Sequence, residues 1–453
     1  MLSFLKNNKS TVVFISLSIL FYGVFCYDLN RSDFIKLISL CGALFFVSYK
    51  LIQINLDRFW LLAGIGILFR LIFLMAIPNL SQDFYRFIWD GRLALQSISP
   101  YLFTPESLLE GTKGVTVKQA QELYAGMGNL NGSHFSNYPP INQLCFAIAA
   151  LFAGKSILGS TIVMRVLIIL ADIGILYFGR KLLLKLKLNP NQIFWYFLNP
   201  FIIIELTGNL HFEGVMLFFL IASLYFLYQK KWVWSAVLLG ISVSVKLIPL
   251  LLLPLYLKWF LNNFNKGFFK LFIFHFIVIG TAVLTFTPFL SAQFISNFSE
   301  TISLWFQNFE FNASIYYIIR WIGFKLIGWN LIETVGKILP LMVILFLIII
   351  SFFRNNKTLP ELITALLIGI SFYFLLSTTI HPWYIATPLL LSVFTKYRFP
   401  IVWSLLVMLS YSAYGFEGFS ENLWLVALEY SVVIGFFIWE SIKLRKVTII
   451  PVI

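Results

Sequence analysis

The feature of this sequence that most restricts its fold is a series of continuous apolar runs, many of about twenty residues, separated by short polar links. A helix of about twenty residues crosses the roughly 30 Å of hydrocarbon in a bilayer. A transmembrane β-barrel would instead show alternating segments of about ten residues. The runs therefore predict an all-α polytopic membrane protein with about 12–14 transmembrane helices.

The composition supports a membrane protein. Hydrophobic residues make up 60% of the chain and charged residues only 11%, against roughly 25% charged residues in an ordinary soluble domain. The net charge of +14 raises the question of nucleic acid. Because the basic residues stand in short groups between apolar runs, as in cytoplasmic loops, we expect no nucleic-acid partner.

The distribution of basic residues also predicts the topology. With the N-terminus inside, more than half of the 33 basic residues fall in cytoplasmic links. The basic group at 180–187 stays inside only if residues 141–153 lie on the outer surface rather than cross. We therefore expect interfacial helices at 141–153 and 314–329, within two external loops at 78–159 and 290–334.

Two carboxylates and two arginines stand directly after a long apolar segment, at the predicted outer surface, in Ser81–Tyr101, SQDFYRFIWDGRLALQSISPY. Asp83 and Asp90 lie seven residues apart, so they share a face of a helix, and Arg86 and Arg92 lie within a turn of one or the other. Charges this close to a bilayer are costly unless they are solvated, paired or used. The segment is therefore the leading candidate for a functional site.

Three further polar clusters are predicted on the same face. Lys246 lies where two short apolar segments meet, and a helix break is expected there and again near His381. The clusters are Gly208–Glu213, Lys246 with the following LIPLLLLP, and His381-Pro382-Trp383-Tyr384. Their convergence predicts that the function lies outside the cytoplasm.

These motifs resemble the bacterial members of the GT-C superfamily, which are integral-membrane glycosyltransferases that use a polyprenyl-phosphate sugar as donor. The resemblance covers about residues 59–395, and it rests on the segments SQDFYRFIWDGRLALQSISPY, NYPPINQL, KLIPLLLLP, NFEFNASIYYIIR and HPWY. It implies a GT-C-like catalytic core at 59–395, preceded by two extra helices at 1–58 and followed by C-terminal helices at 396–453.

The resemblance implies that Asp83 is the catalytic carboxylate. A base must take the proton of the acceptor hydroxyl as that hydroxyl attacks the anomeric carbon. One base without an enzyme nucleophile implies inversion. Asp90 is a second candidate, for a shared base role or for binding sugar hydroxyls. The alternatives are a cap or surface role for Asp83 and pairing with Arg86 or Arg92 for Asp90.

The leaving phosphate needs cationic or hydrogen-bonding partners. The expected donor phosphate-binding residues are Arg86, Arg92, Lys246 and His381. The expected sugar- or acceptor-binding residues are Tyr85, Tyr138, His211, Glu213, Trp383 and Tyr384. Snorkelling is the alternative for Lys246, a solvated loop for His211 and Glu213, and an interfacial anchor for Trp383.

Other polar residues have structural interpretations. Asp172 lies deep in a predicted span, seven residues after Arg165, and an intramembrane ion pair that packs helices is the expected role. Cys26, Cys41 and Cys145 have no metal-ligand spacing and are expected to be packing residues. We expect neither a metal nor a cofactor.

The sequence thus predicts a transferase that moves a hexose, preferably mannose, from a polyprenyl-phosphate sugar to a lipid or glycan acceptor. The site would face the extracytoplasmic side of the cytoplasmic membrane. Two alternatives are a transporter or lipid flippase and a polymerase or ligase of surface polysaccharide. A transporter would place polar groups through the midplane, often in repeated halves, whereas here they gather at one face. A polymerase loop would be rich in arginine.

Overall fold

The computed structural model describes residues 8–111, 116–307, 309–416 and 418–449, with side chains except those of 305–307 and 446–449. The outer ends of the expected N- and C-terminal segments, residues 1–7 and 450–453, lie outside the described residues. The same holds for residues 112–115 of the first expected external loop.

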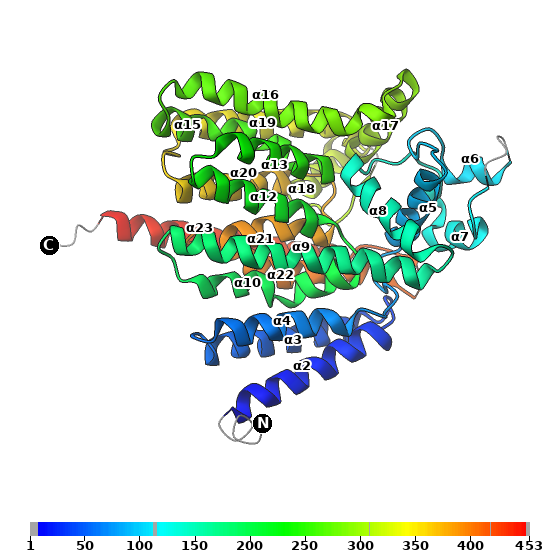
Figure 1. Cartoon of the computed structure of the whole chain (residues 1–453), viewed down its shortest axis with the longest axis horizontal. Helices are drawn as coiled ribbons and strands as arrows, with labels where there is room; N and C mark the ends of the chain where they lie inside the picture. The colour runs from blue at the N-terminus through cyan, green and yellow to red at the C-terminus, as the bar shows by residue number, and fades with distance from the viewer. Residues whose placement is uncertain (1–7, 112–115, 308, 417, 450–453) are drawn as a thin grey trace.

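The described chain is mostly helical and has almost no sheet, which confirms the all-α membrane fold class. Its only strands, within the described ranges, are β1 (Tyr414–Gly415) and β2 (Gly418–Phe419), a short antiparallel pair. The long helices run nearly parallel, and α5 to α8 gather at one end of the bundle (Figure 1).

Seven described helices are long and apolar enough to cross a membrane. They are α2 (Lys9–Tyr27), α3 (Phe34–Ile54), α9 (Ile157–Lys185), α16 (Gly267–Phe286) with η4 (Thr287–Phe289), α19 (Ile332–Phe353), α20 (Leu359–Leu376) and α23 (Leu423–Ile449). A bent pair, Pro200–Gly208 with Glu213–Tyr228, meets the same criterion when its parts are taken together, and its axis turns by 115°. The expected 12–14 spans therefore exceed the full-length helices observed.

The remaining expected spans are shorter or broken. Apolar helices of 10–17 residues are α4 (Phe59–Ile72), α8 (Pro140–Ala153), α13 (Trp232–Val245) and the run formed by α22 (Phe399–Leu406) with η6 (Val407–Ala413). The bent pair contains α11 (Pro200–Ile202), the π-helical η2 (Ile203–Gly208) and α12 (Glu213–Tyr228). Short pieces are η1 (Pro190–Ile193), α10 (Phe194–Phe197), α14 (Ile248–Leu251), η3 (Leu253–Tyr256), α15 (Leu257–Asn263), η5 (Pro382–Ile385) and α21 (Ala386–Ser392).

Prolines explain several of these breaks. Pro200, Pro249 and Pro382 each stand in the first turn of a short helix, where a missing N–H is tolerated and the fixed φ suits a helix start. Lys246, which ends α13, has extended backbone with φ −146° and ψ 137°. The expected breaks near Lys246 and His381 are therefore present.

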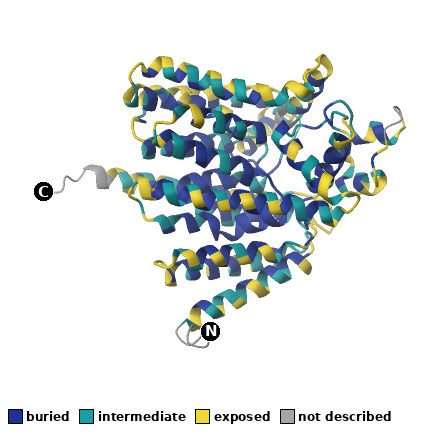
Figure 2. Cartoon of the chain, viewed as in Figure 1, coloured by how far each residue is buried: buried dark blue, intermediate teal, exposed yellow. Residues whose placement is uncertain are grey.

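Buried residues, dark blue in Figure 2, are concentrated in the interior of the helix bundle, and exposed residues, yellow, lie mainly on its periphery. α12 packs against α9 and α13 in the interior, whereas α16 exposes Phe268, Phe272 and Phe276 on one face, by 71%, 66% and 71%. Residues four apart lie on the same side of a helix. A stripe of exposed phenylalanines suits contact with lipid, because lipid tails are as apolar as the side chains.

The intramembrane ion pair expected for Asp172 forms between two helices. Nε of Arg70 on α4 lies 2.8 Å from Oδ2 of Asp172 on α9, and both side chains are fully buried. Arg165 donates to the carbonyl oxygens of Thr207, Gly208 and Leu74. Arg165 and Asp172 are about 10 Å apart along the helix axis. Asp172 therefore forms the expected ion pair that packs helices, and its partner is Arg70 of another helix.

The segments predicted to be external contain several short helices. They are α5 (Asp83–Leu95), α6 (Pro105–Leu109), α7 (Ala120–Gly132), α17 (Ala292–Gln307) and α18 (Ile315–Leu326). The two expected interfacial helices correspond to α8 and α18. α18 exposes large apolar side chains, including Trp321 at 63% and Leu326 at 80%. Their location in the membrane interface remains a prediction.

Candidate functional site

A large cavity of about 860 Å³ lies beside the first turn of α5. The polar part of its wall comes from distant parts of the chain and includes Arg31, Asp83, Lys246 and His381. The apolar part of its wall is formed by α14, α19 and α20, with Leu247, Ile248, Leu250, Leu251, Val343, Ile344 and Tyr373. Polar groups and an apolar groove thus share one space.

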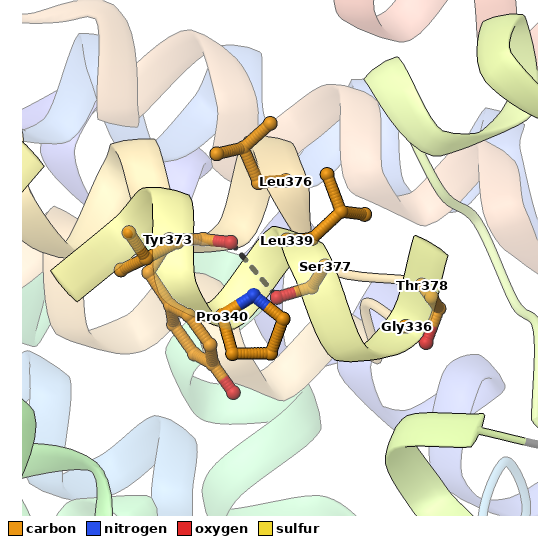
Figure 3. A pocket seen from close by; sticks show the side chains of 8 residues that line it. Gly336, Leu339, Pro340, Tyr373, Leu376, Ser377 and Thr378 are labelled. Carbon is orange, nitrogen blue, oxygen red and sulfur yellow. Dashed lines mark hydrogen bonds between the residues drawn. The ribbon is translucent and has the colours of Figure 1, made fainter. Parts of the chain in front are cut away.

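A small hollow of about 20 Å³ lies between α19 and the end of α20, beside the large cavity (Figure 3). Pro340 and Ser377 belong to the walls of both spaces. The Ser377 hydroxyl donates a 2.8 Å hydrogen bond to the carbonyl oxygen of Tyr373. Because a hollow of this volume has room for about one water molecule, it adds no substrate site of its own.

Asp83 is the first residue of α5, and its side chain lines the cavity. Its backbone N–H donates to the Ser81 hydroxyl oxygen at 3.3 Å, and the Asn131 amide donates to Oδ1 at 3.3 Å. Burial raises the pKa of the Asp83 carboxyl, and the positive charge of Lys246 opposes that rise. The helix dipole at the N-terminus of α5 favours the ionised carboxylate and so also opposes the rise in pKa. Asp83 can therefore act as a base of raised proton affinity.

Lys246 enters the same cavity from the break between α13 and α14. Its ammonium nitrogen lies 2.7 Å from Oε1 of Glu213, the first residue of α12, whose side chain is fully buried. The Tyr138 ring centroid is 6.0 Å from the same nitrogen. Glu213 therefore fixes the position of the cation, while the cation itself faces the cavity.

His381 and Trp383 belong to a stack of three rings. The ring centroids of His211 and Trp383 lie 3.5 Å apart, and those of His381 and Trp383 lie 4.6 Å apart with the planes nearly parallel. Burial, followed by the charges of Lys246 and Arg31, lowers the pKa of His381 to about 3. His381 is therefore neutral at ordinary pH and can offer a phosphate a hydrogen bond rather than a charge.

The other charged residues of α5 do not line the cavity. Nε of Arg86 lies 2.8 Å from Oδ1 of Asp90, and Arg86 also donates to the carbonyl oxygens of Asn131 and His134. Oδ2 of Asp90 accepts hydrogen bonds from Ser136. A second donor to Oδ2 is the Gln143 amide. These contacts hold the segment that carries Asn131, the hydrogen-bond donor to Asp83.

Of the remaining expected site residues, some line the cavity and others do not. Tyr138 and Tyr384 line the cavity, together with Trp383. Arg92 donates to the Gln119 side chain and to the carbonyl oxygen of Lys155. Tyr85, Arg92, His211 and Glu213 are absent from the cavity wall. Direct substrate contacts by these four residues remain predictions, and the observed contacts favour positioning roles for His211 and Glu213.

Sequence reasoning did not select Arg31, Tyr411 and Tyr414, which also line the cavity. Arg31 lies in the turn between α2 and α3. The predicted topology places this link on the same face as Asp83, and that placement was the available signal. For Tyr411 and Tyr414, near β1, no signal separated them from the many other aromatic residues.

Metal binding has no obvious location in this arrangement. Among the residues whose placement is described, no group of three His, Cys, Asp or Glu side chains has a geometry that could hold a metal ion. The cations near Asp83 are instead the side chains of Lys246 and Arg31. The site can therefore pair an anion with protein cations while a carboxylate takes a proton.

A comparison with known protein families finds a match in the N-terminal part of the chain. Residues 38–262 match the family described as Alpha-(1->6)-mannopyranosyltransferase, N-terminal domain. No curated protein matches the chain. The matched range includes Asp83, Glu213 and Lys246 and ends before His381. With the helical membrane fold, this match confirms the resemblance to GT-C mannosyltransferases over residues 38–262.

Proposed function

We propose that this membrane glycosyltransferase moves a hexose, preferably mannose, from a polyprenyl phosphate to a hydroxyl of a lipid or glycan acceptor. The observation that carries the proposal is the shared cavity in which Asp83 and Lys246 meet an apolar groove. The match to a mannopyranosyltransferase family supports mannose as the sugar. In the same proposal, residues 59–395 form the catalytic core.

The apolar wall suits a lipid-linked donor. Leu250 of α14 and Val343 and Ile344 of α19 line the groove that leads to Lys246. Such a wall can accept a polyprenyl chain from the bilayer without a cost in solvation, because its side chains are as apolar as the lipid tails that they replace. With the chain in the groove, the donor phosphate comes to rest beside the Lys246 ammonium, and His381 adds a hydrogen bond. A nucleotide sugar has no group that would fill the groove.

The chemical step follows from the positions of Asp83 and Lys246. The Asp83 carboxylate takes the proton of the acceptor hydroxyl, and the hydroxyl oxygen forms a bond to the anomeric carbon. The bond from that carbon to the phosphate oxygen breaks, and its electron pair leaves with the polyprenyl phosphate. Lys246 stabilises the charge that develops on this phosphate. Attack and departure on opposite faces of the sugar give inversion.

The membrane location completes the proposal. We infer a multi-pass protein of the cytoplasmic membrane whose site faces the extracytoplasmic side. The support is the concentration of lysine and arginine in the links predicted to be cytoplasmic, whereas Asp83 belongs to the opposite end of the bundle with α5–α8 (Figure 1).

The donor class can be tested with purified protein. Radiolabelled mannose is supplied either as polyprenyl-phosphate mannose or as a nucleotide sugar, with a membrane lipid extract as acceptor. We expect labelled product from the lipid donor only. Product from the nucleotide sugar, or no product from the lipid donor with protein shown to be folded, would contradict the proposed donor.

A further inference from the structure

Arg31 brings the N-terminal helix pair into the wall of the cavity. It stands in the turn that joins α2 to α3, and its side chain lines the same space as Asp83 and Lys246. The family match begins at residue 38, so Arg31 lies outside it. The expected division of the chain gave these first two helices no role in the site.

Arg31 forms no direct ion pair with a carboxylate of the described residues. Among the described residues, every ion pair within 4.0 Å involves other cations, and the buried Nε–H of Arg31 has no hydrogen-bond acceptor. Lys246, by contrast, is paired with Glu213. The charge of Arg31 acts on Asp83 and Glu205 only at longer range, so a bound anion can supply the direct contact that Arg31 lacks.

The aromatic surroundings hold the guanidinium in one orientation. Its central carbon lies 3.2 Å from the centroid of the Tyr414 ring. Tyr414 in turn packs edge-on against Phe419 with the ring centroids 5.4 Å apart. Arginine stacks well on aromatic faces, and its planar set of donors matches two oxygens of a phosphate. The stacked arrangement thus presents donors to the cavity with little further ordering required.

We propose that Arg31 binds a phosphoryl group in this cavity, as a second cationic contact besides Lys246, and that the N-terminal helix pair is therefore part of the substrate site. The proposal rests on the proposed function, because it assigns the phosphoryl group to one of the two lipid substrates. The donor phosphate and a phosphate in the acceptor headgroup have the same chemistry toward arginine. Their separate contributions can be measured.

The experiment measures binding rather than turnover. Purified wild type, Arg31→Gln, Arg31→Lys and Arg180→Gln are compared for affinity toward undecaprenyl phosphate, phosphatidylinositol and the neutral undecaprenol. Arg180 is the matched control, because it also stacks on an aromatic ring, 4.8 Å from the Phe59 centroid, at the end of α4 remote from α5. Thermal unfolding of each variant in detergent verifies its fold.

We expect Arg31→Gln to weaken the binding of a phosphorylated lipid by about ten- to hundredfold and to leave undecaprenol binding unchanged. Arg31→Lys should recover part of the affinity, because it restores the charge without the planar donors. Weakened binding of undecaprenyl phosphate identifies the donor phosphate as the ligand of Arg31. Weakened binding of phosphatidylinositol alone identifies the phosphate of the acceptor headgroup instead.

Two results would overturn the assignment of Arg31. One is unchanged affinity of Arg31→Gln for both phosphorylated lipids, and the other is an equal loss in Arg180→Gln. Mannose transfer by the wild type is measured in parallel. A wild type that binds both lipids through Arg31 without transferring mannose refutes the proposed function alone, and one that transfers while Arg31→Gln binds normally refutes the Arg31 assignment alone.

Discussion

Nζ of Lys246 lies 2.7 Å from Oε1 of Glu213, and the two residues are separated by α12 and α13 along the chain. Glu213 is fully buried, whereas the Lys246 side chain keeps 19% of its surface exposed and lines the cavity. The buried Glu213 carboxylate thus holds the Lys246 ammonium at the cavity wall, where the ammonium can contact a bound anion. Several of the following expectations depend on this arrangement.

Replacing Glu213 should impair donor binding through Lys246. In Glu213→Gln the ammonium loses its anionic partner and its fixed position, so we expect the donor KM to rise by about tenfold. In a double-mutant cycle with Lys246→Gln, the two effects should be strongly non-additive. Additive effects on donor KM would show that Glu213 acts independently of Lys246.

Asp83→Asn should abolish transfer without unfolding the protein. Loss of a general base lowers kcat by about 10²- to 10⁴-fold, while Asn keeps nearly the same shape. Glu106→Gln in α6 is the control, because Glu106 is an exposed acid of the same predicted external segment. Wild-type turnover by folded Asp83→Asn would remove Asp83 as the base.

The fall of kcat/KM at low pH should follow the protonation of Asp83. The base works only when ionised, and burial raises the pKa of its carboxyl. Activity should therefore decline as pH falls through that raised pKa, above the ordinary value of about 3.9. Lys246 lowers this pKa, so Lys246→Gln should move the decline to higher pH. A shift to lower pH would contradict the electrostatic link.

His381 should contribute no titration of its own near neutral pH. Its pKa is lowered to about 3 by burial and nearby cations, so the ring is uncharged over the working range. We expect His381→Gln to weaken donor binding and to leave the position of the acid decline in the kcat/KM profile unchanged. A decline near pH 6.5 that disappears in the variant would show a protonated His381 instead.

Asp90 should matter more for stability than Asp83 does. Asp90→Asn leaves the Arg86 guanidinium without its carboxylate, and removal of one partner of a buried pair costs about 3–5 kcal/mol. We expect a lower unfolding temperature in detergent and a smaller fall in kcat than Asp83→Asn produces. Unchanged stability with a full loss of turnover would make Asp90 a catalytic residue.

The sequence could predict the fold class and the positions of the main interruptions. Long apolar runs require helices in a bilayer because backbone groups there must be paired internally, and the short runs at Lys246 and His381 marked the breaks. Motif residues also identified cavity-lining positions before the structure, including Asp83, Tyr138, Lys246 and Trp383. These features depend on local chemistry and chain length.

The tertiary structure decided which charges face the cavity and which face one another. Asp83 and Asp90 share a helix face, but seven residues separate them by about 10 Å along the axis, so only the first reaches the cavity. Arg70 rather than Arg165 meets Asp172, and Arg31 reaches the site from a distant turn. Such pairings depend on how helices rotate and pack against each other, which the periodicity of one segment leaves open.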